Sequence, residues 1–164
     1  VTPDHAESNY RVARELMLDP LRVLPGQIHR IRGELEPETA AREAEAELRW
    51  VAPLLPDGPP VLDLVLLGMG EDGHVASLFP GESVANASSP SVYRAVAAPK
   101  PPPRRVTLGY RVIAAAREAW VLGSGAGKEG ALKESLHPEG RTPLARVLRS
   151  RNGTRVFGDV ELSP

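Results

Sequence analysis

The chain has 164 residues, of which 41% are hydrophobic and 25% are charged, with a formal net charge of -1. This composition is that of an ordinary globular protein, and the length suits one domain with a sizeable core. The balanced charge and the 4% aromatic content argue against a nucleic-acid partner. The chain contains no cysteine, which excludes disulfides and thiolate metal sites.

The N-terminal residues lack the charged-then-apolar plan of a signal peptide. The longest apolar run, residues 61–70, is far shorter than the roughly 20 residues that a membrane span needs. We therefore expect a cytoplasmic protein with no membrane partner.

Two helices and one weak strand are predicted in the N-terminal part. Ser8 is a good N-cap for a first helix that ends before Pro20. Residues 27–32 alternate only loosely and form a weak strand candidate. Residues 37–50 begin with proline and are rich in strong helix formers, so they predict a second helix.

A nearly unbroken apolar run follows at residues 61–67 and predicts a central parallel strand buried on both faces. Further strands are predicted at residues 92–97, 119–122 and 154–160, and a helix at residues 131–136. The alternation of strands and helices predicts an α/β protein: a Rossmann-like, three-layer α/β/α sandwich around a mainly parallel sheet. Residues 1–164 are expected to form a single domain.

A glycine-rich turn comes directly after the central strand. Gly68, Gly70 and Gly73 satisfy the G-x-G-x-x-G pattern of dinucleotide sites. Two features argue against such a site, because Pro80 ends the expected helix early and no acidic residue lies about 20 positions on. A tight strand-to-helix turn without a ligand explains the glycines, but it gives no reason for a histidine at the mouth of the turn.

That histidine, His74, is the candidate general base. Ligands bind at the carboxyl ends of parallel strands, where a neutral imidazole can accept a proton from water. The alternative is a histidine hydrogen-bonded within the turn. Asp72 is expected either to orient or charge-stabilise His74, to fix a cation, or to cap the following helix. Glu71 is interpreted as a solvated turn residue, and Ser77 as a packing or capping residue rather than a nucleophile.

A second glycine-rich turn, residues 123–128, lies between a predicted strand and a predicted helix. Such a turn can present backbone N–H groups and a lysine, here Lys128, to an anion. It is not a P-loop, because the glycine spacing differs and Glu129 stands where Ser or Thr would hold magnesium. A flexible loop with a surface lysine is the alternative.

No metal site is predicted, because His5, His29, His74 and His137 show no ligand spacing. The arginines, including Arg104 and Arg105, are interpreted as mostly a solvated face. The stretch 99–103 is interpreted as a stiff, proline-rich loop.

The stretch from Asp63 to Gly81, DLVLLGMGEDGHVASLFPG, resembles the signature of the 6-phosphogluconolactonases. The related glucosamine-6-phosphate deaminases share the G-x-G-x-D-G-H core but continue to Asn-Glu-Pro-Gly, whereas this chain has Leu-Phe-Pro-Gly at residues 78–81. Further segments are similar to the same family: residues 1–5, 8–10, 104–108, 115–117 and 125–128. The chain departs from the family pattern at Val75, Gly109, Tyr110 and Ala114.

The resemblance implies hydrolysis of 6-phospho-D-glucono-1,5-lactone to 6-phospho-D-gluconate in the oxidative pentose phosphate pathway, without a cofactor. It implies that His74 is the general base with Asp72 beside it, and that Gly70, Gly73 and Lys128 contact the substrate, Lys128 at the phosphate. Two alternatives remain open: a glucosamine-6-phosphate deaminase-like isomerase, and an inactive sugar-phosphate-binding module.

The resemblance covers roughly the last two-thirds of such a domain. The family's N-terminal glycine-serine phosphate loop and acidic-arginine motif have no counterpart in these 164 residues. We therefore expect an open sheet edge, a tendency to form homo-oligomers or aggregates, and weak or no catalysis by the chain alone.

Overall fold

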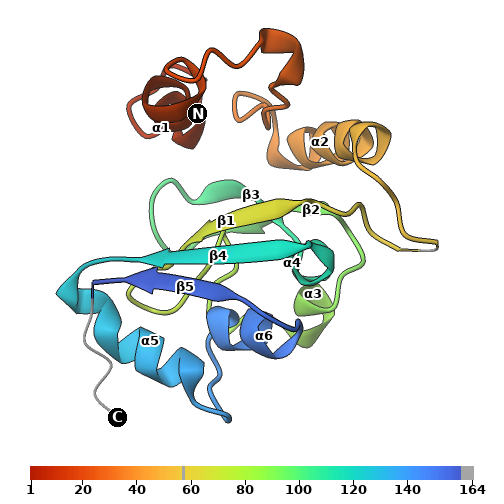
Figure 1. Ribbon diagram of the computed structural model, residues 1–164. Helices are drawn as coiled ribbons and strands as arrows, with labels where there is room; N and C mark the ends of the chain where they lie inside the picture. Colours follow the sequence, from red (N-terminus) through yellow and green to blue (C-terminus); the bar gives the residue numbers. More distant parts are fainter. Residues whose placement is uncertain (57, 160–164) are drawn as a thin grey trace.

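Two sheets organise the computed structural model, which describes residues 1–56 and 58–159 (Figure 1). The larger sheet is parallel, with strand order β1-β4-β5. Its strands are β1 (Leu64–Gly68), β4 (Glu118–Gly123) and β5 (Arg155–Gly158). The smaller sheet pairs β2 (Tyr93–Ala97) with β3 (Arg104–Leu108) in antiparallel register.

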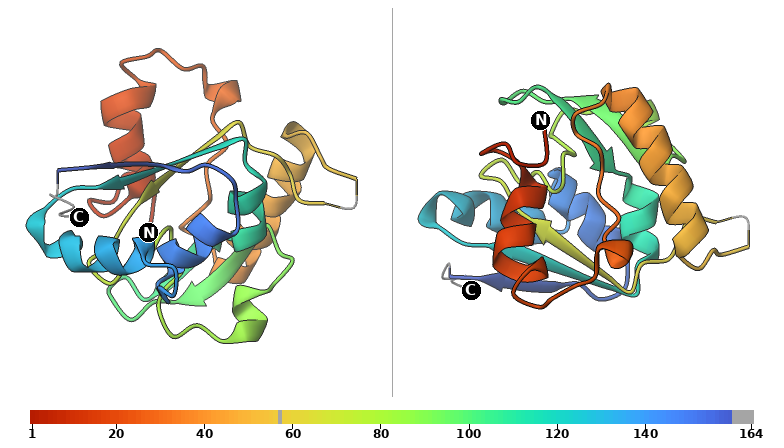
Figure 2. Two further views of the ribbon diagram at one scale, coloured as in Figure 1. Left: turned by 60° about the horizontal axis from the view of Figure 1, so that its bottom comes forward. Right: turned by 90° about the horizontal axis from the view of Figure 1, so that it is seen from above.

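Helices lie on both sides of the parallel sheet, with α5 and α6 on one side and α1 and α2 on the other (Figure 1). The α-helices are α1 (Asn9–Ala13), α2 (Pro37–Val51), α3 (Val84–Ala87), α4 (Tyr110–Ala115), α5 (Glu129–Leu136) and α6 (Pro143–Arg149). The short helical turns are η1 (Arg14–Leu18), η2 (Pro25–Gln27) and η3 (Ala126–Lys128). Helix α2 packs along β2 and β3 (Figure 2). This layered arrangement confirms the predicted fold class.

The core lies between the parallel sheet and helices α5 and α6. Val65 and Leu67 of β1 and Val121 of β4 are buried there in one cluster with Leu132 of α5 and Leu144 of α6. Side chains alternate between the two faces of a strand, so every second residue of β1 and β4 reaches this cluster.

The predicted burial of the central strand on both faces is wrong. The open face of the sheet carries Leu64, Leu66, Trp120, Leu122 and Phe157, with Leu66 51% and Leu122 47% exposed. Trp120 and Phe157 stack edge to face, with ring centroids 5.4 Å apart. An unbroken apolar run fits a strand with two buried faces and also a strand with one apolar face open to solvent, so the pattern could not separate the two.

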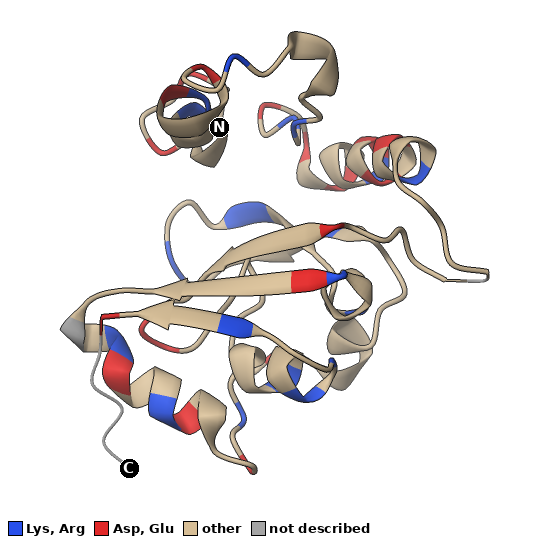
Figure 3. Cartoon of the chain, in the orientation of Figure 1, with Lys and Arg blue, Asp and Glu red and all other residues tan. Residues whose placement is uncertain are grey.

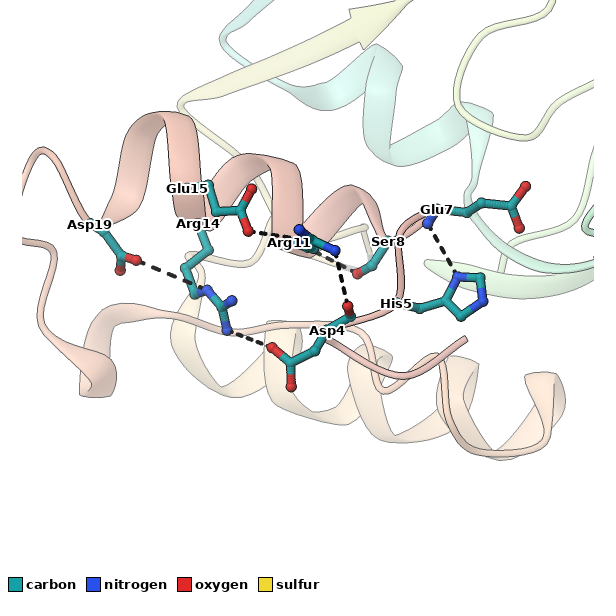
Figure 4. Close-up of polar contacts among 8 residues, drawn as sticks. All are labelled: Asp4, His5, Glu7, Ser8, Arg11, Arg14, Glu15 and Asp19. Carbon is teal, nitrogen blue, oxygen red and sulfur yellow. Dashed lines mark hydrogen bonds and ion pairs between the residues drawn. The ribbon is translucent and has the colours of Figure 1, made fainter.

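The predicted first helix is confirmed, and its cap is the predicted one. The backbone N–H of Arg11 donates to Oγ of Ser8 at 3.2 Å. Ion pairs on the outer surface join Arg11 to Glu15 and Arg14 to Asp4 (Figure 4). These pairs are solvated, so each contributes little to stability.

The strand predicted at residues 27–32 is wrong. The backbone turns at η2 instead, where the side chain of Gln27 accepts a hydrogen bond from the N–H of Leu24. Arg30 then forms two hydrogen bonds with the carboxylate of Glu34. Residues 28–32 belong to no helix or strand and pair with none of the described strands, so the loose alternation predicted a strand that has no partner here.

The remaining predicted elements are confirmed in kind, and four others were missed. Residues 119–122 lie in β4 and residues 131–136 in α5, while β5 lies within residues 154–160, of which Val160 is outside the described residues. Residues 92–97 contain β2, but this strand belongs to the antiparallel pair. The missed elements are β3, α3, α4 and α6. Each has only four to seven residues, too few for a periodic pattern to stand out.

Charged residues of both signs are interspersed along the chain, on helices, loops and strands (Figure 3). No helix within residues 1–56 and 58–159 is both long and apolar enough to span a membrane.

Leu66 and Leu67 are adjacent in β1 but are expected to respond differently to truncation. Leu67 is 3% exposed, so Leu67→Ala should lower the free energy of unfolding by about 2–5 kcal/mol. Leu66→Ala should change it by less than about 1 kcal/mol, because the side chain is already half exposed. Denaturant unfolding measures both; equal losses would show that the open face is covered in solution.

Candidate active site

The turn that follows β1 is a narrow loop fixed by buried residues at its base. Met69 and Val75 face each other across the loop and are 3% and 0% exposed. At the tip, the N–H of Gly70 donates to the carbonyl of His74 at 2.9 Å, and the N–H of Gly73 donates to the carbonyl of Gly70 at 3.0 Å. The loop therefore holds His74 beside the end of the strand.

No helix starts at this turn. The chain continues through turns until α3, so the expected strand-to-helix connection is wrong and Asp72 caps no helix. The buried side chains of Val75 and Leu78 pull the chain back into the core instead. Without a helix N-terminus the turn also lacks the feature on which a dinucleotide pyrophosphate would sit.

Asp72 and His74 form the closest polar contact of the turn. Oδ1 of Asp72 lies 2.5 Å from Nδ1 of His74 and accepts a further hydrogen bond from the backbone N–H of His74 at 3.2 Å. Burial acts to raise the pKa of Asp72, but the hydrogen bonds and the attraction of the His74 ring outweigh it and lower that pKa. An ionised carboxylate only accepts hydrogen bonds, so this contact requires a proton on Nδ1, and in the neutral imidazole Nε2 is then the nitrogen with the free lone pair.

Two further groups surround this pair. The ring of Phe79 lies 4.7 Å from the ring of His74, between centroids, at an interplanar angle of 36°. Lys100, from the loop between β2 and β3, places Nζ 3.6 Å from Oδ2 of Asp72. The sequence analysis missed Lys100, although one signal was available: the chain has only three lysines, Lys100, Lys128 and Lys133, among its 20 basic residues.

Gly70 and Gly73 are glycines for different reasons. A Cβ on Gly70 would overlap the ring of His74. Gly73 has a φ of 73°, and a Cβ there would lie 2.6 Å from Cβ of Thr142, the N-cap of α6. The carbonyl of Gly73 also accepts a hydrogen bond from the N–H of Leu144 at 3.1 Å. Gly70 therefore makes room for the histidine, and Gly73 lets α6 approach the turn.

The second glycine-rich turn lies beside the first. Strands β1 and β4 are parallel, with Gly68 paired to Leu122, so both turns leave the same edge of the sheet. The side chain of Met69 lies against Gly123, and the exposed carboxylate of Glu71 lies against Gly127. Lys128 ends η3 and is the N-cap residue of α5. The fold thus brings the two predicted site segments together.

The other three histidines have structural partners. Nδ1 of His5 accepts from the N–H of Glu7 at 3.1 Å (Figure 4), and Nδ1 of His137 accepts from the N–H of Glu139 at 3.2 Å. His29 contacts the carboxylate of Glu47 at 2.8 Å. Within the described ranges, no three His, Asp or Glu side chains are grouped as a metal site requires.

A cavity of about 650 Å³ lies behind the turn, between the N-terminal segment and β3. Ala76, Ser77 and Arg105 line it, but His74 and Asp72 do not. Because neither residue of the Asp72–His74 pair lines this cavity, we place the candidate site at the carboxyl ends of β1 and β4 instead.

Comparison with known proteins assigns the family. A family model described as "Glucosamine-6-phosphate isomerases/6-phosphogluconolactonase" matches residues 1–157. The chain belongs to this family. It is 39% identical over 145 residues to the 6-phosphogluconolactonase of Homo sapiens, a match that covers 88% of this chain and 55% of that protein. It is 40% identical over 142 residues to "Probable 6-phosphogluconolactonase 3, chloroplastic" of Oryza sativa subsp. indica, covering 83% of this chain and 43% of that protein.

Solved structures of the family have the same fold. A 6-phosphogluconolactonase from Trypanosoma brucei superposes with a TM-score of 0.76 at 31% identity, over 96% of this chain and 67% of that chain. A monomeric glucosamine-6-phosphate deaminase superposes with a TM-score of 0.73 at 19% identity, which shows a shared fold alone. The chain spans about half the length of the curated relatives it matches, from 43% to 58%.

Alanine substitutions at Gly70 and Gly73 are expected to have different effects, the first on the position of His74 and the second on the free energy of unfolding. Gly70→Ala should displace the flexible His74 side chain and break its bond to Asp72, with the free energy of unfolding changed by less than about 1 kcal/mol. Gly73→Ala should instead lower the free energy of unfolding by about 1–3 kcal/mol, because both its φ and its contact with Thr142 are unfavourable. Denaturant unfolding and the imidazole ¹⁵N spectrum separate the two effects. A folded Gly70→Ala chain with an unchanged His74 spectrum would contradict this account.

Proposed function

We propose that this chain carries the catalytic base of a 6-phosphogluconolactonase, which hydrolyses 6-phospho-D-glucono-1,5-lactone to 6-phospho-D-gluconate. The observation that carries the proposal is the 2.5 Å contact between Nδ1 of His74 and Asp72. That contact commits Nδ1 as a donor and leaves Nε2 as the acceptor that a general base needs. Family membership supplies the substrate class.

In the proposed reaction, Nε2 of His74 takes a proton from water as the oxygen attacks the lactone carbonyl. The bond between the carbonyl carbon and the ring oxygen then breaks, and the imidazolium returns its proton to that oxygen. Asp72 stabilises the imidazolium during this interval because its carboxylate stays ionised. Water supplies the only added atoms, so these steps need no redox cofactor and form no covalent enzyme intermediate.

Gly70, Gly73 and Lys128 complete the proposed substrate contacts. Lys128 lies at the start of α5, where free backbone N–H groups and the helix dipole favour an anion. A sugar phosphate at this edge can place its phosphate on the second turn and its lactone on the first. We assign the phosphate to Lys128 on this placement together with the resemblance of residues 125–128 to the family.

The two rival functions lead to different measurements. A deaminase would release ammonia from glucosamine 6-phosphate, but the segment that follows His74 here has Leu78 and Phe79, as the lactonases do. A binding module would bind 6-phosphogluconate in calorimetry without accelerating lactone hydrolysis. Assays of both substrates, with calorimetry of the product, decide among the three.

A cytoplasmic setting and self-association through the open face also belong to this proposal. With no cysteine the chain forms no disulfide and needs no oxidising compartment, although the two rice relatives with 40% identity carry the word chloroplastic in their names. An apolar sheet face of this kind favours association of two copies. Cell fractionation and sedimentation velocity test these two points.

In a full-length version of this protein, His74→Ala should lower lactone turnover at least ~100-fold with little effect on folding, because general base catalysis contributes about 10²–10⁴ in rate. A rapid, pH-controlled assay must first show that the unsubstituted full-length protein exceeds spontaneous hydrolysis. His137→Ala is the matched control, since that ring only accepts a backbone hydrogen bond at the end of α5. Near-normal turnover in the His74 variant would remove this residue from the mechanism.

Lys128→Ala should raise KM and leave kcat within about threefold, because a phosphate contact holds the ground and transition states alike. Lys133→Ala is the control: Lys133 lies on the same helix and pairs with Glu129 at 2.7 Å. Steady-state kinetics over a wide lactone range measures both constants. An unchanged KM in Lys128→Ala would identify Lys128 as a surface residue.

A further inference from the structure

Lys100 contacts the one oxygen of Asp72 that His74 leaves unused. Oδ1 of Asp72 bonds to His74, and Oδ2 lies 3.6 Å from Nζ of Lys100. The three side chains form a row, Lys100–Asp72–His74, in which the carboxylate is held from both sides. Lys100 comes from the loop between β2 and β3, so the row joins the antiparallel sheet to the turn after β1.

Arg105 holds the loop that carries Lys100. Its Nε donates to the carbonyl of Pro102 at 2.8 Å, and its Nη2 donates to the carbonyls of Pro101 at 2.9 Å and Lys100 at 3.3 Å. Proline has no N–H, so residues 101–103 donate no backbone hydrogen bond; the loop is closed by the N–H of Ala98, which donates to the carbonyl of Pro103 at 2.7 Å, and Arg105 supplies its further donors. A planar guanidinium with several donors suits that task. The expectation that Arg105 belongs to a solvated face is therefore wrong.

The same guanidinium also contacts the ring of Phe79, which in turn contacts His74. Its central carbon lies 5.6 Å from the centroid of the Phe79 ring, and Phe79 stacks on His74. Arg105 thus fixes Lys100 on one side of the Asp72–His74 pair and Phe79 on the other. A change at Arg105 should disturb both supports.

The Lys100–Asp72 contact is too exposed to matter much for folding. The side chain of Lys100 is 52% exposed, and exposed ion pairs contribute roughly 0–1 kcal/mol. The three hydrogen bonds from Arg105 to the loop therefore do more than support a weak surface ion pair. They hold the ammonium group of Lys100 beside Oδ2 of Asp72.

We propose that Lys100 is a positioning residue for the lactonase reaction, holding Oδ2 of Asp72 so that Oδ1 stays turned toward Nδ1 of His74, while Arg105 fixes the loop that carries it. The catalytic consequence rests on the proposed function. The orientation of Asp72 and His74 does not, and it can be measured without substrate.

The first experiment reads the His74 imidazole in ¹⁵N-labelled full chain by long-range ¹H–¹⁵N correlation. The unsubstituted chain should show the tautomer protonated on Nδ1. Lys100→Met should lower the population of that tautomer at least about twofold, and Lys100→Arg should largely restore it. Lys133→Met, which removes a surface lysine on α5, should leave the spectrum unchanged. An unchanged spectrum in Lys100→Met would overturn the proposal.

Substitutions at two neighbouring arginines test whether Arg105 holds the loop that carries Lys100. Arg105→Met should shift the His74 tautomer as Lys100→Met does, because it releases the loop. Arg104→Met should not, because the neighbouring Arg104 is 62% exposed and pairs with Glu36 on the surface. Loss of the native fold in Arg105→Met would be seen in the same spectrum, and Arg105→Lys then serves as the milder variant. Equal shifts of the His74 tautomer in the Arg104 and Arg105 variants would contradict the specific role of Arg105.

The second experiment is a double-mutant cycle in lactone turnover. Lys100→Met should lower kcat about tenfold with KM changed less than about twofold, and it should have no further effect in an Asp72→Asn background. A raised KM with unchanged kcat would instead make Lys100 a substrate-binding lysine and overturn the positioning role. The cycle is run in a full-length version of this protein; if that protein turns over no lactone, the proposed function fails, while the His74 spectrum still decides the role of Lys100.

Discussion

The hydrogen bond between Asp72 and His74 depends on the absence of a side chain at Gly70. Any Cβ there would occupy the space of the imidazole, so the pair can form only across a bare backbone. Once the pair has formed, Nδ1 is used, and among the described residues no protein donor bonds to Nε2. The narrow tip of the loop therefore fixes the position of the ring and favours the neutral tautomer with its proton on Nδ1.

Parallel pairing of β1 with β4 brings the rest of the site to this pair. Turns that follow parallel neighbours leave the same edge of the sheet, which places Lys128 and His74 on connections that lie side by side. The second turn has glycines where side chains of the first turn lie against it. Met69 packs on Gly123, and Glu71 lies against Gly127. A site divided between two connections can hold the two ends of an extended substrate at once, which a single loop of this length could not do.

The sequence predicted what is local and missed what arises between distant segments. The glycine turn, His74 and the Ser8 cap follow from short-range rules, because the reason for each residue lies within a few positions of it. The role of Asp72 could not be decided from spacing, because a cap and an orienting carboxylate need the same residue at the same place. The structure excludes the cap, because no helix begins there, and shows that Oδ1 of Asp72 lies against the ring of His74. Lys100 and Arg105 lie 28 and 33 positions beyond Asp72, and only the β2–β3 hairpin brings them back to it.

One face of β3 holds both the loop that carries Lys100 and the segment that follows His74. Arg105 and Thr107 are two residues apart on the strand and therefore point to the same side. Arg105 holds the Lys100 loop, while Oγ1 of Thr107, which is 1% exposed, accepts a hydrogen bond from the N–H of Ser77 at 3.1 Å. Ser77 follows Ala76, whose φ of 51° is unfavourable for a residue with a Cβ and needs such an anchor. Strand β3 therefore bonds both to Ser77, in the segment that follows His74, and to the loop that carries Lys100. Because one strand holds both segments, it also fixes the distance from Lys100 to Asp72.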